Sequence, residues 1–506
     1  MAAALALAAF VLHAATTWRY GYFRDELYFI ACAKHLSWGY VDQPPLVAFA
    51  AFLSAPAHYH LTLLRLLPSL AAAGTVWLAV RLTRELGGGR LAQAVAGIAV
   101  MLLPAYLLLG NTLTTTSFEP LFWTLLLYAA VRMVRSGDPR WWAAIAAAFV
   151  FGMYGKYSML LCAAAVAAGL LATHHRRLLF SRWSAAALAL SALALWPNIA
   201  WQWAHGWPFV QVVQGDFAHR HAFQNGMELE YRNTMLNGAA FALEQIVYSN
   251  PLAAVVWAAG LIAFAAWPPL RDLRFVTIAY FIAVAAAVVL AAKGYYVIGF
   301  YAVPIAGGAV YFERALQGTR LRAAAAAVAA ASALIFLPLA LPVLPVDGLV
   351  EYSRALGLTG RNGSAPRLIQ PLFAEEFGWR ELTARVAGVY DALPPRVRAR
   401  TAIFADTYGD AGALAFYGPQ YGLPDPISAQ NTFYLWGPRA YNGRSLLMVG
   451  ASQADLVHSL YRKMTLVATY ADPYKWVVEG PTPIYLCSDP IAPLPQLWPR
   501  LKWYGA

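Results

Sequence analysis

Long apolar segments separated by short polar connections fill the first two thirds of the chain, and this pattern predicts a bundle of membrane-spanning helices. We expect about eleven spans, at residues 1–18, 61–80, 91–109, 120–131 with its flanks, 141–154, 159–172, 185–199, 251–267, 275–292, 297–312 and 323–344. The first segment is either a retained helix or a cleaved signal peptide. The lack of basic residues at its start favours the retained helix.

Two polar stretches interrupt this pattern. Residues 19–60 are too charged to span a bilayer and too apolar to form a free tail. One or two helices lying on the membrane surface are therefore expected there, with a break at Pro44 and Pro45. Residues 201–250 are rich in Trp, His, Asn and Gln, and they predict a polar loop.

The pattern changes near Pro345, where charged residues and short β-like runs replace the apolar segments. Helices are expected at residues 379–393 and 454–461, the second opened by a capping box of Ser452 and Asp455. Strands are expected at residues 401–405, 445–449, 465–470 and 483–487. The predicted fold is an all-α polytopic membrane domain in residues 1–344, followed by a small soluble α/β domain in residues 345–506.

The composition supports a membrane protein. Hydrophobic residues make up 60% of the chain and charged residues only 12%, with a mean hydropathy of +0.51. Soluble domains carry about a quarter charged residues. The net charge of +12 would suggest a nucleic-acid partner in a soluble chain. Here the basic residues lie mainly in short connections, so no nucleic-acid partner is expected. Three cysteines do not support a disulfide framework.

The basic residues follow every second predicted span. They are Arg81, Arg84, Arg90, Arg132, Arg135, Arg140, Arg176, Arg177, Arg182, Arg271, Arg274, Arg314, Arg320 and Arg322. Because short basic loops stay in the cytoplasm, the intervening connections are placed on the outer face. The C-terminal domain shares that side by parity. We therefore expect a multi-pass protein of a bacterial-type inner membrane, with its polar site outside the cytoplasm.

Carboxylates stand out among the outer-face residues. Asp25 and Glu26 are adjacent acids at a membrane surface, where they need a cation, a metal or a proton to coexist. One of them can take a proton from an incoming hydroxyl or amine. The simpler interpretation is a solvated acid paired with Arg24. Glu119 precedes Pro120 at a helix start, so its alternative is a helix cap.

Cations occur at the same face. Lys156 lies between Gly155 and Tyr157 at the outer end of a span, and snorkelling toward water is its alternative interpretation. Arg65 is basic at an outer end, against the general trend, so it either snorkels or binds an anion. Lys293 precedes Tyr295 and Tyr296, which an aromatic belt also explains. Acids and cations together at this depth describe a site for a lipid-linked phosphate and a nucleophile.

Several of these residues resemble motifs of the GT-C superfamily of integral-membrane glycosyltransferases. The group concerned is family 39, which includes the protein O-mannosyltransferases and the lipid A aminoarabinose transferase. The resemblance is carried by Arg24 to Tyr28, Asp42 to Leu46, Glu119-Pro120, Gly155 to Tyr157 and Lys293 to Tyr296. It covers most of the membrane part and, more loosely, the C-terminal domain.

The resemblance implies an inverting transfer of a sugar from a polyprenyl-phosphate donor to an extracytoplasmic lipid, glycan or protein. Carried over by position, Asp25 is the general base, Glu119 is the second acidic position, and Lys156 holds the donor phosphate. Glu26 joins the catalytic acids, Arg65 and Lys293 join the phosphate-binding cations, and Asp42, Gln43, Tyr295 and Tyr296 are expected to bind substrate.

The chain departs from many relatives at two positions. Gln43 stands where they have a histidine, and Glu119 where they have an aspartate. Donor identity and the use of a divalent metal therefore stay open, and no other cofactor is expected. A transporter or flippase of a lipid-linked or amphipathic solute is the alternative function, although its charges would lie at mid-membrane depth.

Overall fold

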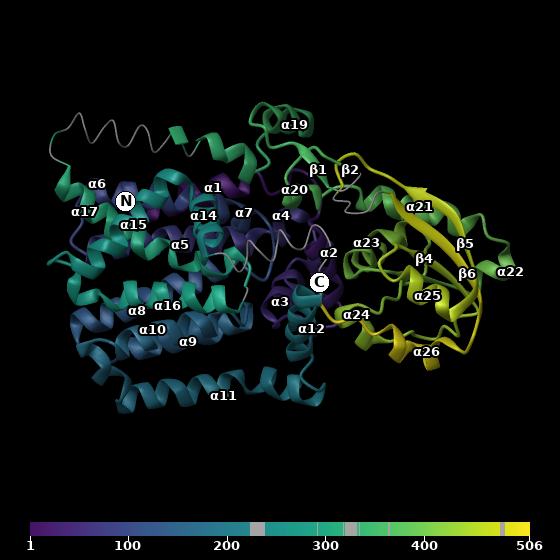
Figure 1. Ribbon diagram of the computed structural model, residues 1–506, viewed down its shortest axis with the longest axis horizontal. Coiled ribbons are helices and arrows are strands. Elements are labelled where there is room, and N and C mark those ends of the chain that lie inside the picture. Colours follow the sequence, from purple (N-terminus) through teal and green to yellow (C-terminus); the bar gives the residue numbers. More distant parts are fainter. Residues whose placement is uncertain are drawn as a thin grey trace.

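The computed structural model describes residues 1–222, 238–290, 292–316, 318, 331–332, 334–362, 365–475 and 481–505. A bundle of helices forms one end of the molecule and a smaller α/β domain forms the other, with short helices between them (Figure 1). We call the end of the bundle that faces the α/β domain the domain-facing end, and the other the opposite end.

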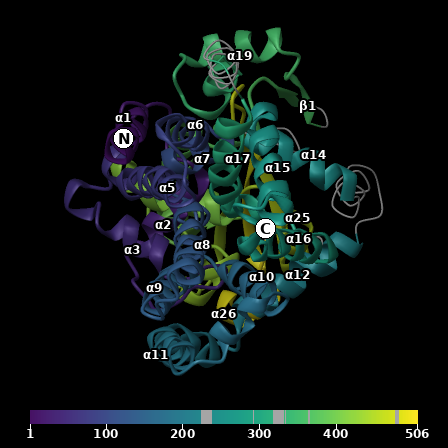
Figure 2. The same ribbon diagram turned by 90° about the vertical axis from the view of Figure 1, so that its left-hand side faces the viewer.

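The bundle helices follow the predicted apolar segments, and each of the first ten predicted spans contains a helix. They are α1 (Ala2–Ala14), α5 (Leu66–Glu85), α6 (Arg90–Met101), α7 (Pro104–Asn111), α8 (Glu119–Ser136), α9 (Trp141–Gly155), α10 (Met159–Leu171), α11 (Arg182–Ala204), α15 (Pro251–Ala266), α16 (Phe275–Val289) and α17 (Ala302–Ala315). Figure 2 shows the bundle end-on, with α11 at its edge. The last predicted span, residues 323–344, lies partly outside the described residues, and its described part is helical at residues 331–332 and 334–340.

Not every bundle helix is long enough to cross a membrane alone. Among the described residues, three helices are long and apolar enough, and up to six spans result if each bent pair counts as one. In one such pair, α6 and α7 meet at 59°. Pro104, at the start of α7, has no N–H for the helix ladder, which explains the break.

Short helices cover the domain-facing end. Residues 19–60 form α2 (Arg24–Ala33) and α3 (Leu46–Phe52), followed by α4 (Leu61–Leu64). Pro45 directly precedes α3, as the predicted break requires. One or two helices were expected in this stretch, and two α-helices are present.

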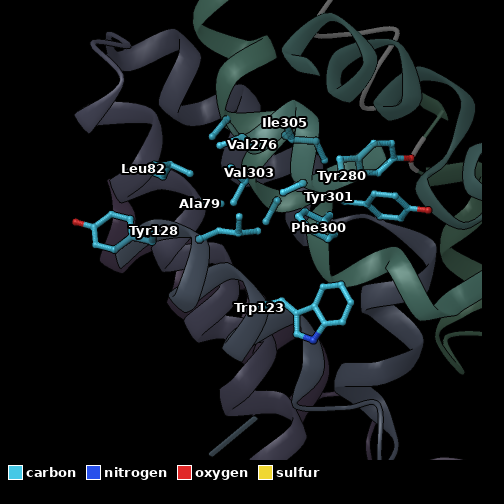
Figure 3. Packing of buried hydrophobic residues seen from close by; sticks show 14 of the residues in the cluster. Ala79, Leu82, Trp123, Tyr128, Val276, Tyr280, Phe300, Tyr301, Val303 and Ile305 are labelled. Carbon is cyan, nitrogen blue, oxygen red and sulfur yellow. The ribbon is translucent and has the colours of Figure 1, made fainter. Parts of the chain in front are cut away.

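The core of the bundle fixes the connection before α17. Here η4 (Gly294–Phe300) packs on Trp123 of α8, whose ring meets that of Phe300 edge-on at 5.3 Å (Figure 3). A Cβ at Gly299 would come within 2.6 Å of the Trp123 ring, so only glycine allows this approach. The Tyr106 hydroxyl donates to the carbonyl of Ile298 at 2.8 Å. The turn that carries Lys293, Tyr295 and Tyr296 is thus held by buried contacts.

The C-terminal domain contains a four-stranded sheet in the order β3-β4-β6-β5. Strands β3 (Thr401–Ala405) and β4 (Ser445–Val449) are parallel, whereas β6 (Thr482–Pro490) is antiparallel to both β4 and β5 (Tyr461–Tyr470). Its helices are α19 (Val346–Ala355), α20 (Pro371–Ala374), α21 (Trp379–Asp391), α22 (Pro395–Arg398), α23 (Tyr408–Tyr417), α24 (Asn431–Trp436), α25 (Ala454–Leu460) and α26 (Leu494–Leu501). A short hairpin pairs β1 (Gly360–Asn362) with β2 (Ala365–Arg367). The predicted fold class, a helical membrane domain followed by a small α/β domain, is confirmed.

Two local predictions were wrong. Residues 201–250 are not a loop where the structure describes them, because they contain the end of α11, then α12 (Pro208–Ala222) and α14 (Gly238–Ser249). Gln245 of α14 donates to the carbonyl of Gly294 at 3.0 Å, so packing against η4 stabilises this helix. The polar composition of residues 201–250 had instead predicted a loop. The capping box at Ser452 is also absent. Instead, Asp406 accepts the backbone N–H groups of Ser452 and Gln453 before α25.

Candidate active site

Lys156 lies at the domain-facing end and contacts four residues. Three of them, Glu119, Tyr295 and Tyr296, were predicted site residues, and Thr116 was not. Lys156 Nζ is 2.8 Å from Thr116 Oγ1 and 3.5 Å from Glu119 Oε2. The ring centroids of Tyr296 and Tyr295 lie 4.4 and 4.8 Å from the same nitrogen, within cation–π range. Three connections that are far apart in sequence therefore meet at one ammonium group, and we call these five residues the lysine cluster.

The two charged side chains of the lysine cluster are largely buried. The Glu119 side chain is 1% exposed and that of Lys156 is 15% exposed. Glu119 is the first residue of α8, where the partial positive charge of the helix end favours a carboxylate, and Ser158 donates a further hydrogen bond to it. An ammonium has three donors, and two acceptors contact it among the described residues. The arrangement suits Lys156 to an additional anionic group.

Asp25 lies in the first turn of α2 and contacts the C-terminal domain. Its Oδ1 accepts a hydrogen bond from the Tyr408 hydroxyl at 2.9 Å and one from Arg24 Nε at 3.3 Å. Arg24 Nη1 also pairs with Glu375 Oε1 at 3.0 Å. The Asp25 side chain is 26% exposed, so it reaches solvent while being held on one side. We call Arg24, Asp25, Glu375 and Tyr408 the aspartate cluster.

One turn connects the two clusters. Tyr295 and Tyr296 contact Lys156, while the charge of Lys293 acts on Glu375. Burial raises the pKa of Glu375 to about 7, with Arg24 and Lys293 lowering it and Asp25 raising it. The predicted acids and cations thus lie at the same end of the bundle.

Arg65 and Glu26 do not join these clusters. Both side chains are fully buried, and Arg65 Nε pairs with Glu26 Oε1 at 2.8 Å and Nη2 with Glu376 Oε2 at 3.3 Å. Glu26 also accepts the backbone N–H groups of Phe23 and Leu113, both at 2.8 Å. This network ties α2, the start of α5 and the C-terminal domain together, a geometry that favours structural roles for both residues over phosphate binding and catalysis.

The network holds two carboxylates and one guanidinium, which affects stability. Burial raises the pKa of Glu376 to about 8, although Arg65 opposes this. The folded state then keeps a proton that the unfolded chain loses near pH 4.5, so stability should fall by about 2–4 kcal/mol between pH 5 and pH 8.

Glu376→Gln mimics the protonated acid, and we expect it to flatten this dependence of stability on pH. Unfolding in detergent across this range measures it, with the exposed Glu381→Gln as control; a wild-type slope in Glu376→Gln contradicts the assignment.

Asp42 and Gln43 lie beside α2, outside both clusters. Asp42 Oδ1 accepts from the Tyr28 hydroxyl at 2.6 Å, and its Oδ2 accepts from Asn431 Nδ2 at 3.3 Å. Gln43 is 1% exposed, and its Oε1 has no hydrogen-bond partner among the described residues. Asp42 therefore faces the C-terminal domain, whereas Gln43 is interior.

Sequence reasoning missed the contributions of the C-terminal domain. Glu375, Glu376 and Tyr408 each bond to a residue of the first outer connection or of the second predicted span. The available signal was the pair Glu375-Glu376 between Phe373 and Phe377, since adjacent acids among aromatic residues are costly without a basic partner.

The sequence did not decide whether the protein uses a divalent metal ion. Within the described ranges, one set of side chains has ligand atoms close enough for a metal ion, namely His174, His175 and Asp272. It lies in the connections η2 (His174–Leu179) and η3 (Arg271–Leu273), among the basic residues of the opposite end. This set is separate from both clusters.

Solved structures of other membrane proteins show the same overall fold. Two crystal structures of ArnT from Cupriavidus metallidurans, in the apo state and bound to undecaprenyl phosphate, superpose with TM-scores of 0.57 and 0.56. Each comparison covers 96% of this chain and 97% of that chain at 14% sequence identity. The shared fold is that of the GT-C membrane glycosyltransferases.

A family model narrows the assignment. Residues 42–201 match the family described as dolichyl-phosphate-mannose-protein mannosyltransferase. Family model and fold together confirm the resemblance of this chain to GT-C superfamily glycosyltransferases of the protein O-mannosyltransferase and ArnT-like type. The matched region includes Glu119 and Lys156 but begins after Asp25. No curated protein sequence matches the chain significantly.

Proposed function

We propose that this protein transfers a sugar from a polyprenyl-phosphate donor to an extracytoplasmic acceptor, with inversion at the anomeric carbon. The observation that carries the proposal is the lysine cluster, in which Lys156 contacts the buried Glu119 and the two tyrosines of the turn from Lys293 to Tyr296. A base and a phosphate-binding cation on adjacent clusters are what a single displacement needs. The ArnT structure with undecaprenyl phosphate supports a lipid phosphate of this kind.

The proposed reaction uses the two clusters for different bonds. An acceptor hydroxyl or amine loses its proton to Asp25 while its oxygen or nitrogen bonds to the anomeric carbon. The bond from that carbon to the phosphate oxygen breaks, and polyprenyl phosphate leaves with an additional negative charge. Lys156 and Lys293 stabilise this charge, Glu119 orients Lys156 and the sugar, and Tyr295 and Tyr296 border the path of the lipid.

The remaining predicted residues have supporting roles in this proposal. Asp42 would orient the acceptor from the side of the C-terminal domain, and Gln43 would support the connection behind it. Glu26 and Arg65 stabilise α2, whose first turn presents Asp25. We further propose that the domain-facing end lies outside the cytoplasm of a bacterial-type inner membrane. The basic opposite end, which includes Arg132, Arg135 and Arg314, would then lie in the cytoplasm.

The assay uses purified protein in lipid nanodiscs, a panel of radiolabelled polyprenyl-phosphate sugars and total envelope extract. We expect label from at least one donor to appear in a lipid, glycan or protein fraction, with release of polyprenyl phosphate. If every donor stays intact, the proposal is wrong. Movement of an intact labelled donor across the bilayer of a proteoliposome, without cleavage, would instead support the flippase.

A further inference from the structure

The C-terminal domain contributes two side chains to the surroundings of Asp25. We propose that Tyr408 and Glu375 are positioning residues that hold Asp25 and Arg24 for base catalysis, so that the domain completes the catalytic centre. This inference rests on the proposed function and deepens it. Neither residue lies in the region matched by the family model.

Tyr408 fixes one oxygen of Asp25 and leaves the other available. Both hydrogen bonds to Asp25, from the Tyr408 hydroxyl and from Arg24 Nε, reach Oδ1. Oδ2 accepts no hydrogen bond from the described residues, and the side chain is partly exposed. A carboxylate held through one oxygen presents the second to an incoming proton in a defined direction.

Tyr408 is itself held in place. Its backbone N–H donates to Gln430 Oε1 at 2.7 Å, and it is the first residue of α23. Helix α23 packs directly on α2, because a Cβ at Gly412 would lie 2.8 Å from the backbone of Leu27. The two helices lie next to each other between the bundle and the sheet (Figure 1). The packing of α23 on α2 therefore fixes the backbone of Tyr408, and its hydroxyl is held in position beside Asp25.

Glu375 acts on Asp25 through Arg24. The backbone N–H of Arg24 donates to the carbonyl of Glu375 at 3.1 Å, and the guanidinium pairs with the Glu375 carboxyl at 3.0 Å. The stem of Arg24 lies against Gly409, where a Cβ would come within 2.5 Å of Arg24 Cγ. The shorter ionic contact of Arg24 is thus to Glu375, and Arg24 donates only one hydrogen bond to Asp25, at 3.3 Å. An aspartate in a full bidentate pair with arginine would be a weaker base.

The test combines kinetics with a chemical measurement of Asp25. Tyr408→Phe should lower kcat about tenfold with an unchanged KM for the donor, and move the acid limb of the pH–rate profile to higher pH. A hydrophobic carbodiimide modifies protonated carboxyls, and peptide mass spectrometry gives the extent at Asp25 as a function of pH. In Tyr408→Phe this labelling should extend to higher pH, because the carboxylate has lost a donor. Tyr485→Phe on β6 is the matched control.

Glu375 is tested by two substitutions. Glu375→Ala should lower kcat about tenfold, whereas Glu375→Gln, which keeps an oxygen for Arg24, should restore most of it. The unfolding temperature of each variant shows whether folding is affected. Equal loss in both variants, or loss only in proportion to reduced stability, overturns the role of Glu375.

The labelling separates the two proposals. If wild-type protein transfers no sugar but labelling of Asp25 shifts in Tyr408→Phe, the proposed function fails and the positioning by Tyr408 stands. If labelling and pH profile match those of the wild type, the positioning by Tyr408 is wrong, whatever the transfer activity.

Discussion

Replacing Asp25 by asparagine is expected to lower kcat for sugar transfer by about 10²–10⁴-fold, the usual contribution of a positioned general base. The substitution is nearly isosteric. The amide oxygen of asparagine can still accept the hydrogen bonds of Tyr408 and Arg24, so the first turn of α2 should keep its conformation. The amide cannot take a proton from the acceptor, and the chemical step should therefore slow while donor binding persists. Single-turnover transfer from a polyprenyl-phosphate sugar measures this step.

The control for Asp25→Asn is Asp455→Asn, an exposed carboxylate of α25 in the C-terminal domain. Binding of polyprenyl phosphate and the unfolding temperature should match the wild type in both variants. Transfer at the wild-type rate in Asp25→Asn would remove Asp25 as the base. Loss of transfer together with loss of donor binding would point to a damaged site rather than to a missing base.

Much of the fold could be predicted because apolar length and alternation are local signals. The predicted strands at residues 401–405 and 445–449 coincide with β3 and β4. Convergence of Lys156, Glu119, Tyr295 and Tyr296 could also be anticipated, because all four lie at ends of spans that the basic connections place on one side. In a membrane protein, residues on the same side and at the same depth of the bilayer are candidates to lie close together, and both properties can be inferred from the sequence.

Pairing across domains could not be predicted in this way. Arg65 is a basic residue at the outer end of a predicted span, and its position therefore suggested that it binds an anionic ligand. Its partners are instead Glu26 and Glu376, which are 39 and 311 residues away in the sequence. Local patterns show that a buried charge needs a partner without showing which one. The same holds for Tyr408 beside Asp25, since a tyrosine at the start of a helix in a soluble domain has many ordinary explanations. Helix α14 escaped prediction because its packing against η4 outweighs its polar flanks.

Replacing Lys156 by methionine is expected to lower kcat/KM by about 10²–10³-fold, as for the loss of one preorganised group that stabilises developing charge. In the proposed reaction the leaving phosphate gains negative charge, which the ammonium group of Lys156 would stabilise. Removing the lysine alone also leaves Glu119, 1% exposed, without its ionic partner, which can cost about 3–5 kcal/mol of stability. The double variant Glu119→Gln with Lys156→Met avoids this unpaired charge.

Three comparisons make the Lys156 experiment decisive. Glu119→Gln alone, with the lysine present, should bind undecaprenyl phosphate more tightly than the double variant, as measured by the concentration dependence of the thermal shift. Lys156→Arg should keep part of the binding, because it keeps the charge but presents a planar fork in place of a compact ammonium. Lys463→Met, on the exposed strand β5, should behave as the wild type. Equal phosphate binding in Glu119→Gln and in the double variant would show that Lys156 serves only to neutralise Glu119. The donor phosphate would then require another cation at the domain-facing end, such as Lys293 of the turn that also carries Tyr295 and Tyr296.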